Sequence, residues 1–420
     1  MSLNNTPKGN RLHIGIFGRR NAGKSSLINA LAGQARAIVS DTPGTTADPV
    51  FKSMELHPIG PVVLMDTAGF DDDGELGKLR VDRTTAMIDR TDLAILLLDG
   101  TEDPDHVFSQ SDVQWLQKLQ AADIPTIVAV NKCDVRKAEE RAAVERAIHD
   151  AARACLGDLL DPIFWISAKT GSGIDRLRQA IIHAVPEDFL EEGLLKGLVT
   201  DDSLVLLVMP QDIQAPKGRL ILPQVQTIRD LLDRKCTVLS TTADRFTQSL
   251  SVLNRAPDLI ITDSQCFDLV SQQKPQTSRL TSFSILMAAA KGDIRVFVEG
   301  VSAMDQFTAR MDEAPRFRVL IAEACAHVPL KEDIGTVKIP MLLHKQYGDR
   351  VEITSVRGDD FPQGDDLKQY DLIIHCGACM FNRKHVLSRI DAAEAAGVPI
   401  TNYGIFLAKM AGILDKVCLP

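Results

Sequence analysis

The chain contains 420 residues, of which 25% are charged and 45% hydrophobic, and it carries a formal net charge of −9 at pH 7. This length suffices for two or three domains with cores of ordinary size, and no apolar run approaches the roughly 18 residues that a membrane span requires. The start lacks a secretion signal, and neither a basic stripe nor interleaved aromatics suggest nucleic acid as a partner, so we expect a cytoplasmic protein that acts away from membranes and nucleic acids.

Short apolar runs alternate with longer amphipathic stretches from residue 11 to about residue 186. Such alternation predicts strands and helices in βαβ order, and therefore an N-terminal domain over residues 1–187 with a mostly parallel sheet. Residues 186–202 are acidic and contain glycines, which is typical of a domain boundary. The expected strands are 12–17, 62–65, 93–98, 126–130 and 163–166, and the expected helices include 142–155 and 174–184.

Two further α/β domains are expected after this boundary, a small middle domain over 188–270 and a C-terminal domain over 271–420. The fold class is therefore α/β with three domains. In the middle domain we expect strands 204–209, 236–239 and 259–262 and helices 224–234 and 244–253. In the C-terminal domain we expect strands 317–322, 350–355, 371–375 and 398–401 and helices 280–290 and 386–396.

A phosphate-binding motif follows the first expected strand. Residues 18–25 read GRRNAGKS, which fits the pattern GxxxxGK followed by Ser or Thr, and a helical run comes directly after them. The glycines Gly18 and Gly23 let backbone N–H groups close around the β- and γ-phosphates at a helix N-terminus. Lys24 neutralises phosphate charge, and the Ser25 hydroxyl coordinates Mg²⁺. Taken alone, the motif also fits a simple glycine-rich turn between a strand and a helix.

Two later motifs at strand ends predict guanine as the base. Residues 131–134 read NKCD, and the Asp134 carboxylate can accept from both N1–H and N2–H₂ of guanine, a pair that adenine lacks. Residues 167–169 read SAK and offer a backbone N–H to guanine O6. Lys132 and Lys169 can lie along the faces of the base.

A fourth motif, DTAG at residues 66–69, places the Asp66 carboxylate in the outer shell of Mg²⁺ and the Gly69 N–H at the γ-phosphate. Four motifs in this order, all at strand ends, predict a domain that binds and hydrolyses GTP. The residues expected to contact the nucleotide or its metal are Gly18, Asn21, Ala22, Gly23, Lys24, Ser25, Ser26, Thr45, Thr46, Asp66, Gly69, Asn131, Lys132, Asp134, Ser167, Ala168 and Lys169.

The stretch DTPGTTAD at residues 41–48 has the features of a mobile switch loop. Here the chain resembles the bacterial GTPases related to the tRNA-modification GTPase and Era, whose P-loop reads GRxNxGKSS and whose switch reads PGTT. By that resemblance Thr46 completes the Mg²⁺ shell, and Asn21 marks a potassium-dependent member in which K⁺ takes the place of an arginine finger. The resemblance thus assigns catalysis to Asn21, Lys24, Thr46 and Gly69. As an alternative, Asn21 is only a turn residue.

Position 70 holds Phe where a glutamine would orient the attacking water. We therefore expect slow hydrolysis in the absence of K⁺ or of a rearrangement. The acidic residues Asp71, Asp72, Asp73 and Glu75 follow. One of them positions the water, or all belong to a solvated acidic loop; the sequence leaves this open.

Five cysteines and histidines gather at two strand ends in the last hundred residues, as Cys325-Ala-His327 and His375-Cys376-Gly-Ala-Cys379. In a doubly wound sheet such ends converge on one crevice, so three thiols and two imidazoles could meet there. Three soft thiolates with an imidazole suit an iron–sulfur cluster or zinc. Each element alone has another interpretation, a thioredoxin-like redox pair for the CxxC and a hydrogen-bonded side chain for a single His. The remaining cysteines have no partner spacing and are expected to pack in cores; they are Cys133, Cys155, Cys236, Cys266 and Cys418.

A GTPase domain followed by CxH, a gap of nearly fifty residues and HCxxC resembles the family of [FeFe]-hydrogenase maturation GTPases along the whole chain. That resemblance implies a dimerising middle segment and a [4Fe–4S] cluster on Cys325, Cys376 and Cys379 with an exchangeable fourth ligand. It also implies a scaffold and carrier that receives a diiron precursor, a transient subcluster, from two radical-SAM maturation enzymes and delivers it to the apo-hydrogenase.

Three fixed thiolates leave one iron with an open position, which a carrier needs and a closed structural site lacks. His327 or His375 supplies the fourth ligand, or either one only donates hydrogen bonds to the cluster; the sequence leaves this open, as it does the link between GTP hydrolysis and cluster transfer.

Two hypotheses of other classes stand beside this one. A ribosome- or RNA-associated GTPase with a zinc module would need a basic surface in the C-terminal half, which the acidic balance does not supply. A thiol-redox protein fused to a GTPase would need Cys376 and Cys379 to form a reversible disulfide.

Overall fold

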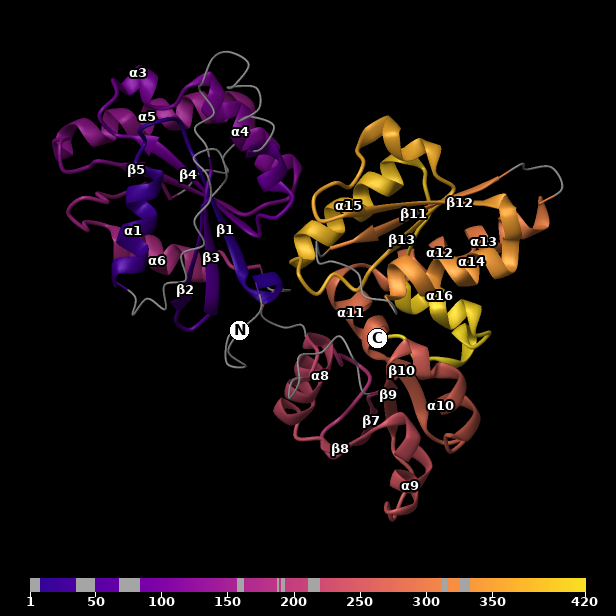
Figure 1. The fold of residues 1–420 in the computed structure, drawn as a ribbon. Helices are drawn as coiled ribbons and strands as arrows, with labels where there is room; N and C mark the ends of the chain where they lie inside the picture. Colours follow the sequence, from indigo (N-terminus) through magenta and orange to yellow (C-terminus); the bar gives the residue numbers. More distant parts are fainter. Residues whose placement is uncertain are drawn as a thin grey trace. The chain divides into compact units, whose positions relative to one another are not determined.

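The computed structural model describes residues 8–34, 50–67, 84–156, 162–186, 193–210, 220–311, 316–324 and 333–420, together with residue 189 (Figure 1). The chain divides into two compact units, residues 1–191 and residues 192–420. Among the described helices, none combines the length and the apolar character needed to cross a membrane.

The first unit is built on a six-stranded sheet with the order β2-β3-β1-β4-β5-β6. All its neighbouring strands are parallel except β2 and β3, which form an antiparallel pair. The expected mostly parallel sheet is therefore confirmed, with one strand, β2, that the sequence analysis did not single out. The strands are β1 (Leu12–Phe17), β2 (Val50–Leu56), β3 (Gly60–Asp66), β4 (Leu93–Asp99), β5 (Thr126–Asn131) and β6 (Phe164–Trp165).

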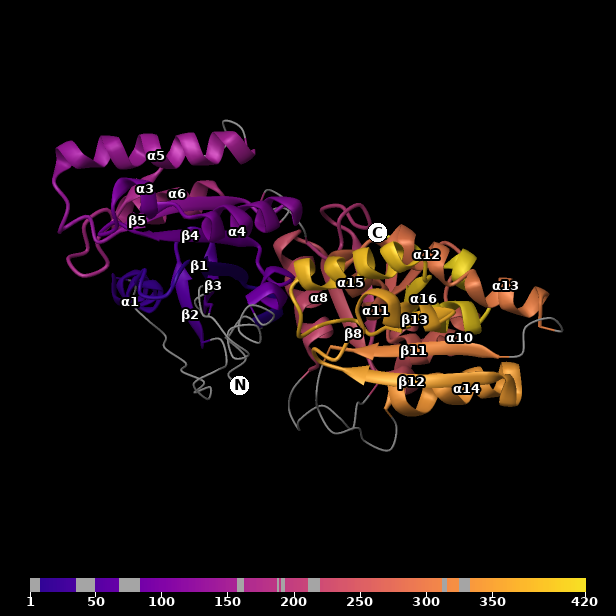
Figure 2. The same cartoon turned by 90° about the horizontal axis from the view of Figure 1, so that it is seen from above.

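Helices cover both faces of this sheet, and Figure 2 shows α5 on one side and α1 on the other. One buried cluster joins the sheet to α1 and α6, and a second joins it to α4 and α5. Because both faces are covered, β1 and β4 consist almost entirely of apolar residues, as parallel strands usually do. The helices are α1 (Lys24–Gln34), α3 (Pro104–Val107), α4 (Gln110–Ala121), α5 (Ala138–Leu156) and α6 (Ile174–His183).

The second unit contains two four-stranded parallel sheets, ordered β10-β9-β7-β8 and β12-β11-β13-β14. The strands of the first sheet are β7 (Leu204–Val208), β8 (Thr237–Thr241), β9 (Leu259–Thr262) and β10 (Arg279–Ser282). Those of the second are β11 (Phe317–Glu323), β12 (Val351–Arg357), β13 (Leu372–His375) and β14 (Ile400–Asn402). The helices are α8 (Leu222–Asp233), α9 (Phe246–Ser251), α10 (Phe267–Gln273), α11 (Phe283–Lys291), α12 (Ile294–Gly300), α13 (Ala303–Ala309), α14 (Ile339–Tyr347), α15 (Arg383–Ala396) and α16 (Tyr403–Met410).

The prediction of a helix over 280–290 is wrong for its first residues. Residues 279–282 pair with β9 as the edge strand β10, and only then does α11 begin. Ser282 marks the change, because its hydroxyl accepts the backbone N–H of Ile285 and so caps the helix. The middle sheet therefore extends beyond residue 270, and the boundary expected at 270/271 falls inside α10, so it needs correction.

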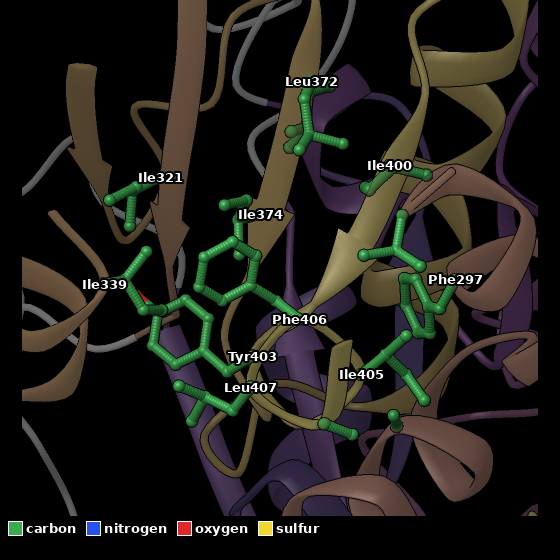
Figure 3. Close-up of a cluster of buried hydrophobic side chains, with 14 of the residues drawn as sticks. Phe297, Ile321, Ile339, Leu372, Ile374, Ile400, Tyr403, Ile405, Phe406 and Leu407 are labelled. Atoms are coloured by element: carbon green, nitrogen blue, oxygen red, sulfur yellow. The ribbon is translucent and has the colours of Figure 1, made fainter. Parts of the chain in front are cut away.

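One continuous core joins the two sheets of the second unit, from Leu206 and Ile260 of the first sheet to Phe406 of α16. Figure 3 shows the part of it in which α16 and α12 pack against β13 and β14. Helix α11 contacts β10 and α8 on one side and α12, α15 and α16 on the other, so it lies between the two sheets (Figure 1). Each large apolar side chain fully buried here contributes about 1.5–3 kcal/mol relative to exposure.

Replacement of Gly300 by alanine tests this packing. A Cβ at Gly300 would lie 2.0 Å from the carbonyl oxygen of Ile400, so α12 could remain in place only by displacing β14. We expect Gly300→Ala to destabilise the second unit by about 1–3 kcal/mol. The matched control is Gly33→Ala on α1, where nothing lies within 4 Å of the new atom and the better helix propensity stabilises the first unit by up to about 1 kcal/mol.

The two transitions can be followed separately in urea, because both tryptophans, Trp115 and Trp165, belong to the first unit. Circular dichroism should show an earlier transition for Gly300→Ala while its tryptophan fluorescence transition stays at the wild-type midpoint. An unchanged circular dichroism curve would contradict the close packing of α12 on β14.

Candidate functional site

Residues of three sequence motifs line one pocket of about 940 Å³ in the first unit. They come from the P-loop and α1, from the segment after β5 and from the segment after β6, so the carboxyl ends of three parallel strands supply the lining. This volume suits a small-molecule ligand such as a nucleotide. The lining residues are Asn21, Gly23, Lys24, Ser25, Ser26, Asn29, Ala30, Asn131, Lys132, Asp134, Val135, Ser167, Ala168 and Lys169.

The P-loop needs its glycines for space as well as for backbone conformation. Gly23 has a φ of +94°, and a Cβ there would lie 2.3 Å from the side-chain nitrogen of Asn131. The Lys24 ammonium donates to the carbonyl oxygens of Gly18 at 2.8 Å and Arg19 at 2.9 Å, which holds its charge inside the loop. Asn21 has a φ of +63°, a conformation that Asn tolerates better than most residues, and its exposed side chain lines the pocket. Both interpretations of Asn21 therefore stay open.

The two residues expected around Mg²⁺ in the described part of the chain are in contact. The Ser25 hydroxyl donates to the Asp66 carboxylate over 2.5 Å. Burial raises the pKa of Asp66, while the Ser25 hydrogen bond and the Lys24 charge oppose that rise. A hydroxyl and a carboxylate side by side are the hard oxygen donors that Mg²⁺ prefers.

Asn131 connects all three loops of the pocket. Its side-chain amide donates to the carbonyl oxygen of Ala22 in the P-loop over 2.8 Å, and its oxygen accepts the backbone N–H of Ala168 over 3.0 Å. The buried side chain of Asn131 thus ties the phosphate end of the pocket to the guanine end. The backbone N–H of Ala168, in the segment expected to bind guanine O6, is engaged with Asn131 in this arrangement.

Asp99, at the end of β4, is a functional residue that the sequence analysis missed. Its Oδ2 atom lies 2.5 Å from Nζ of Lys132, and its Oδ1 atom accepts from the hydroxyl of Thr101. Burial raises the pKa of Asp99, but the hydrogen bonds from Lys132 and Thr101 outweigh burial and leave the pKa lowered. Asp99 therefore holds the lysine that is expected to lie along the base. The only available signal was its position, a carboxylate at the end of an apolar strand next to the P-loop strand.

Asp134 lies at the rim of the pocket with its side chain exposed, as a residue that accepts hydrogen bonds from guanine must. A hydrogen bond from the buried hydroxyl of Ser167 lowers the pKa of Asp134, so its carboxylate is ionised at neutral pH. The NKCD and SAK motifs are thus in direct contact. The predicted residues Thr45, Thr46 and Gly69, together with Phe70 and the acidic residues 71–75, lie outside the described residues.

The strands that precede the two cysteine motifs are neighbours, as expected. β11 and β13 pair in parallel, with Ala322 opposite His375. The Cys376 thiol accepts the backbone N–H of Ala324 over 3.1 Å and that of Ala378 over 3.4 Å. Ala324 is the residue before Cys325, which with His327 lies outside the described residues. The last described residue before the CxH motif therefore contacts the Cys376 sulfur.

His375 is fully buried, and both of its ring nitrogens have protein partners. Nε2 lies 3.1 Å from Nη1 of Arg389, which can only donate, so Nδ1 carries the proton and donates to the carbonyl oxygen of Cys376 over 2.8 Å. Burial, together with the charge of Arg389, lowers the pKa of His375 to about 3, so the ring is neutral. In this geometry neither ring nitrogen of His375 is available as a metal ligand, and its one N–H donates to the protein backbone, so His375 takes neither of the two roles considered for it at a cluster.

Cys376 and Cys379 both carry reduced thiols. Burial raises the pKa of Cys379, and the charge of the nearby Lys291 opposes that rise. Ala378, between them, has a φ of +50°, an uncommon conformation for a residue with a Cβ and typical of strained functional loops. Within the described ranges, no three His, Cys, Asp or Glu side chains form a group that could hold a metal.

Comparison with known families separates the first unit from the rest of the chain and divides the second unit into two segments. Residues 13–132 match the model of the 50S ribosome-binding GTPase, and residues 78–187 match the elongation factor Tu GTP binding domain. Residues 194–292 match the hydrogen maturase F dimerization domain, and residues 295–420 match the hydrogen maturase F tetramerization domain. The chain belongs to the hydrogen maturase F (HydF) family. The two HydF segments meet after α11, in agreement with the strand order of the middle sheet.

Relatives of the N-terminal unit of this HydF family member are GTPases. The tRNA modification GTPase MnmE of Ralstonia nicotianae is 35% identical over 187 residues, 44% of this chain and 36% of that protein. GTPase Der of Caldicellulosiruptor saccharolyticus is 34% identical over 176 residues, 41% of this chain and 39% of that protein. The chain thus spans less than two fifths of either relative. A crystal structure of Era from Aquifex aeolicus aligns with 58% of this chain and 98% of its own at 19% identity and a TM-score of 0.35.

The family matches and the GTPase relatives confirm the predicted activity, hydrolysis of GTP, and the assembled pocket agrees with it. Nucleotide and Mg²⁺ are the ligands expected of such a domain. The HydF matches also favour the hydrogenase maturation hypothesis over the ribosome-associated one, since they cover nearly all of the chain after residue 193.

Exchange of Asp134 for asparagine tests the assignment of the base. Asparagine keeps the size of the side chain but presents an amide donor where guanine N1–H and N2–H₂ need an acceptor. We expect the Kd for GDP to rise by at least about tenfold, the loss expected for one hydrogen bond to a charged group. Xanthosine diphosphate, which carries a carbonyl oxygen at position 2, should gain affinity. Calorimetric titration with both nucleotides checks this, and unchanged GDP binding would contradict the role of Asp134.

Proposed function

We propose that this HydF family member is a GTP-hydrolysing scaffold and carrier that binds a [4Fe–4S] cluster through Cys325, Cys376 and Cys379. Its substrate would be the diiron precursor of the hydrogenase active-site cluster, assembled on this scaffold and transferred to the apo-[FeFe]-hydrogenase. The observation that supports this most is the position of Cys376, whose sulfur accepts two backbone N–H groups where β11 and β13 end side by side.

The donor set suits an iron–sulfur cluster. Backbone N–H groups directed at a cysteine sulfur stabilise its thiolate form and tune clusters in proteins. Cys379 lies in the same short loop, and Cys325 follows Ala324, whose N–H already reaches the Cys376 sulfur. Two ligands therefore come from one loop and the third from the neighbouring strand end, without any need for distant segments to move together.

A carrier must release its cargo, and a cluster held by only three protein thiols suits that purpose. When bound, the cluster would supply one iron whose fourth position exchanges its ligand. Because both nitrogens of His375 are engaged with Arg389 and Cys376, we infer that His375 orients the loop and that the exchangeable position is filled by another group. His327 stays a candidate for that position.

The two HydF domain types support an oligomer, at least a homodimer, formed through residues 194–420. The proposed partners are the apo-hydrogenase and two radical-SAM maturation enzymes. In this proposal the nucleotide acts as a timer: ordering of the switch around Thr46 by GTP and Mg²⁺ would change the contacts to partners.

Exchange of Cys376 for serine tests the cluster assignment. We expect wild-type protein reconstituted anaerobically with iron and sulfide to be brown and to give the electron paramagnetic resonance signal of a reduced [4Fe–4S] cluster. Cys376→Ser should lose the signal and most of the iron, because a hydroxyl is a poor ligand for this metal. GTP hydrolysis should stay near the wild-type rate, since Cys376 belongs to the other unit.

The matched control is Cys418→Ser, another partly exposed cysteine of the second unit, which lies outside both motifs in the sequence. This variant should keep its iron. A wild-type protein that binds zinc but no iron and sulfide, or a Cys376→Ser variant that keeps its cluster, would overturn the proposal. Loss of iron from both variants would indicate a general folding defect and would also count against it.

The proposed dependence on K⁺ is tested through Asn21. If its side-chain oxygen ligates K⁺ beside the phosphates, kcat for GTP hydrolysis should be on the order of tenfold or more higher in KCl than in NaCl of equal ionic strength. Asn21→Ala should lose this difference while its rate in NaCl stays unchanged. Equal rates of the wild-type protein in both salts would contradict the K⁺ site. Asn21 would then be only a turn residue, a role that agrees with its positive φ.

A further inference from the structure

The side chain of Arg19, the second residue of the P-loop, points away from the nucleotide pocket. Asn21, Gly23 and Lys24 line the pocket, and Arg19 does not. Its Nε atom lies 3.3 Å from Oδ2 of Asp112, and its Nη2 atom donates to the carbonyl oxygens of His106 and Val107, each over 3.0 Å. One guanidinium thus joins the phosphate-binding loop to α3 and α4.

The carboxylate of Asp112 is held firmly in place. Its side chain is fully buried, and its Oδ2 atom also accepts the backbone N–H of Ser109 over 2.9 Å and the Ser109 hydroxyl over 2.7 Å. Ser109 in turn caps α4, so the pair forms a capping box. The same helix inserts Trp115 and Leu116 into the core behind the sheet. The carboxylate therefore cannot follow a moving P-loop without uncapping and shifting the helix.

The main chain of Arg19 carries this restraint into the site. Its carbonyl oxygen accepts Nζ of Lys24 over 2.9 Å and the backbone N–H of Ala22 over 3.3 Å. A change in the position of residue 19 would move both the charged lysine and the turn that closes around the phosphates. Contacts thus run without interruption from Asp112 through Arg19 to Lys24.

We propose that Arg19 is a positioning residue that holds the P-loop in its binding conformation by clamping the loop to Asp112 and to the α3 carbonyls. A loop that is held in advance does not have to be ordered by the nucleotide. Without the clamp the loop populates other conformations. The apparent nucleotide affinity then falls in proportion to the fraction of molecules whose loop is competent to bind.

This role has a kinetic signature that a direct catalytic role lacks. The loop holds the phosphates that GTP and GDP share, so loss of the clamp weakens both nucleotides by the same factor. At saturating GTP the loop is closed by the ligand, and kcat is preserved, which is the pattern of lost uniform binding.

The test is Arg19→Met, which replaces the aliphatic part of the arginine side chain and removes its charge and its donors. Kd is measured by fluorescence titration with labelled GDP and with a labelled non-hydrolysable GTP analogue, and kcat and KM by phosphate release. We expect both Kd values and KM to rise about tenfold, as for a loop that is competent about a tenth of the time, with kcat within about twofold of wild type.

The matched control is Arg178→Met on α6 of the same unit. The Arg178 side chain is 21% exposed, close to the 19% of Arg19, but its partner Asp175 is 82% exposed. Both Kd values should remain at the wild-type level in this variant. Equal weakening by Arg178→Met and Arg19→Met would mean a general loss of stability and would overturn the proposal.

A second variant, Asp112→Asn, removes the anchor charge while an amide oxygen can still accept from Ser109. It should weaken both nucleotides, and its addition to Arg19→Met should cause no further loss, because the two changes break one contact. Independent, multiplicative losses would overturn the proposal. So would wild-type affinities of Arg19→Met, or a loss confined to the GTP analogue or to kcat, which would place Arg19 at the γ-phosphate.

If Arg19→Met does not fold, as judged by the fluorescence of Trp115 and Trp165 together, Arg19→Lys provides the same test. Lysine keeps the charge but cannot reach Asp112 and both carbonyls together. Intermediate Kd values would support the clamp, and wild-type values would overturn it.

Discussion

Parallel pairing of the strands is the constraint on which both sites depend. It places the carboxyl ends of neighbouring strands at one edge of a sheet, so segments far apart in sequence meet without long excursions of the chain. In the first unit this edge brings the P-loop after β1 within hydrogen-bonding distance of Asn131 after β5. In the second unit it brings Ala324 after β11 to the Cys376 sulfur after β13. The nucleotide pocket and the cysteine loop therefore both form where the carboxyl ends of parallel strands meet.

Close approach of backbone at these edges leaves little freedom in the choice of residue. Gly18 and Gly100 have no room for a Cβ, since it would lie 2.4 Å from the carbonyl oxygen of Leu97 in one case and 2.3 Å from that of Asn131 in the other. At the cysteine loop, Ala378 takes a positive φ in spite of its side chain. The hydrogen bonds of His375 and Cys376 hold the part of the loop that leads into Ala378 and offset the cost of its conformation, which is of order 1–3 kcal/mol.

The fold class, most of the strands and most of the residues that line the pocket could be predicted from the sequence, because each rests on a local pattern that the chain carries in one stretch. What could not be predicted rests on tertiary contacts. Leu280 to Ser282 are compatible with the beginning of an amphipathic helix, and only pairing with β9 makes them a strand. The partner of Lys132, Asp99, lies 33 residues earlier in an apolar run. His375 was a plausible metal ligand from its spacing, and only the burial of Arg389 against it shows where its nitrogens point.

The position of α11 has a consequence for how the two HydF segments communicate. The helix belongs to the segment that matches the dimerization domain, yet its C-terminal end is closed by Arg383, whose Nη1 atom donates to the carbonyl oxygens of Ala290 and Gly292, each over 3.2 Å. Arg383 begins α15, four residues after Cys379. Since unpaired carbonyls at a buried helix end are costly, the cysteine loop and α11 cannot separate without losing these bonds. A displacement of the middle sheet that moves α11 must therefore also move, or strain, the loop that carries Cys376 and Cys379, so the two segments are mechanically one piece at this junction.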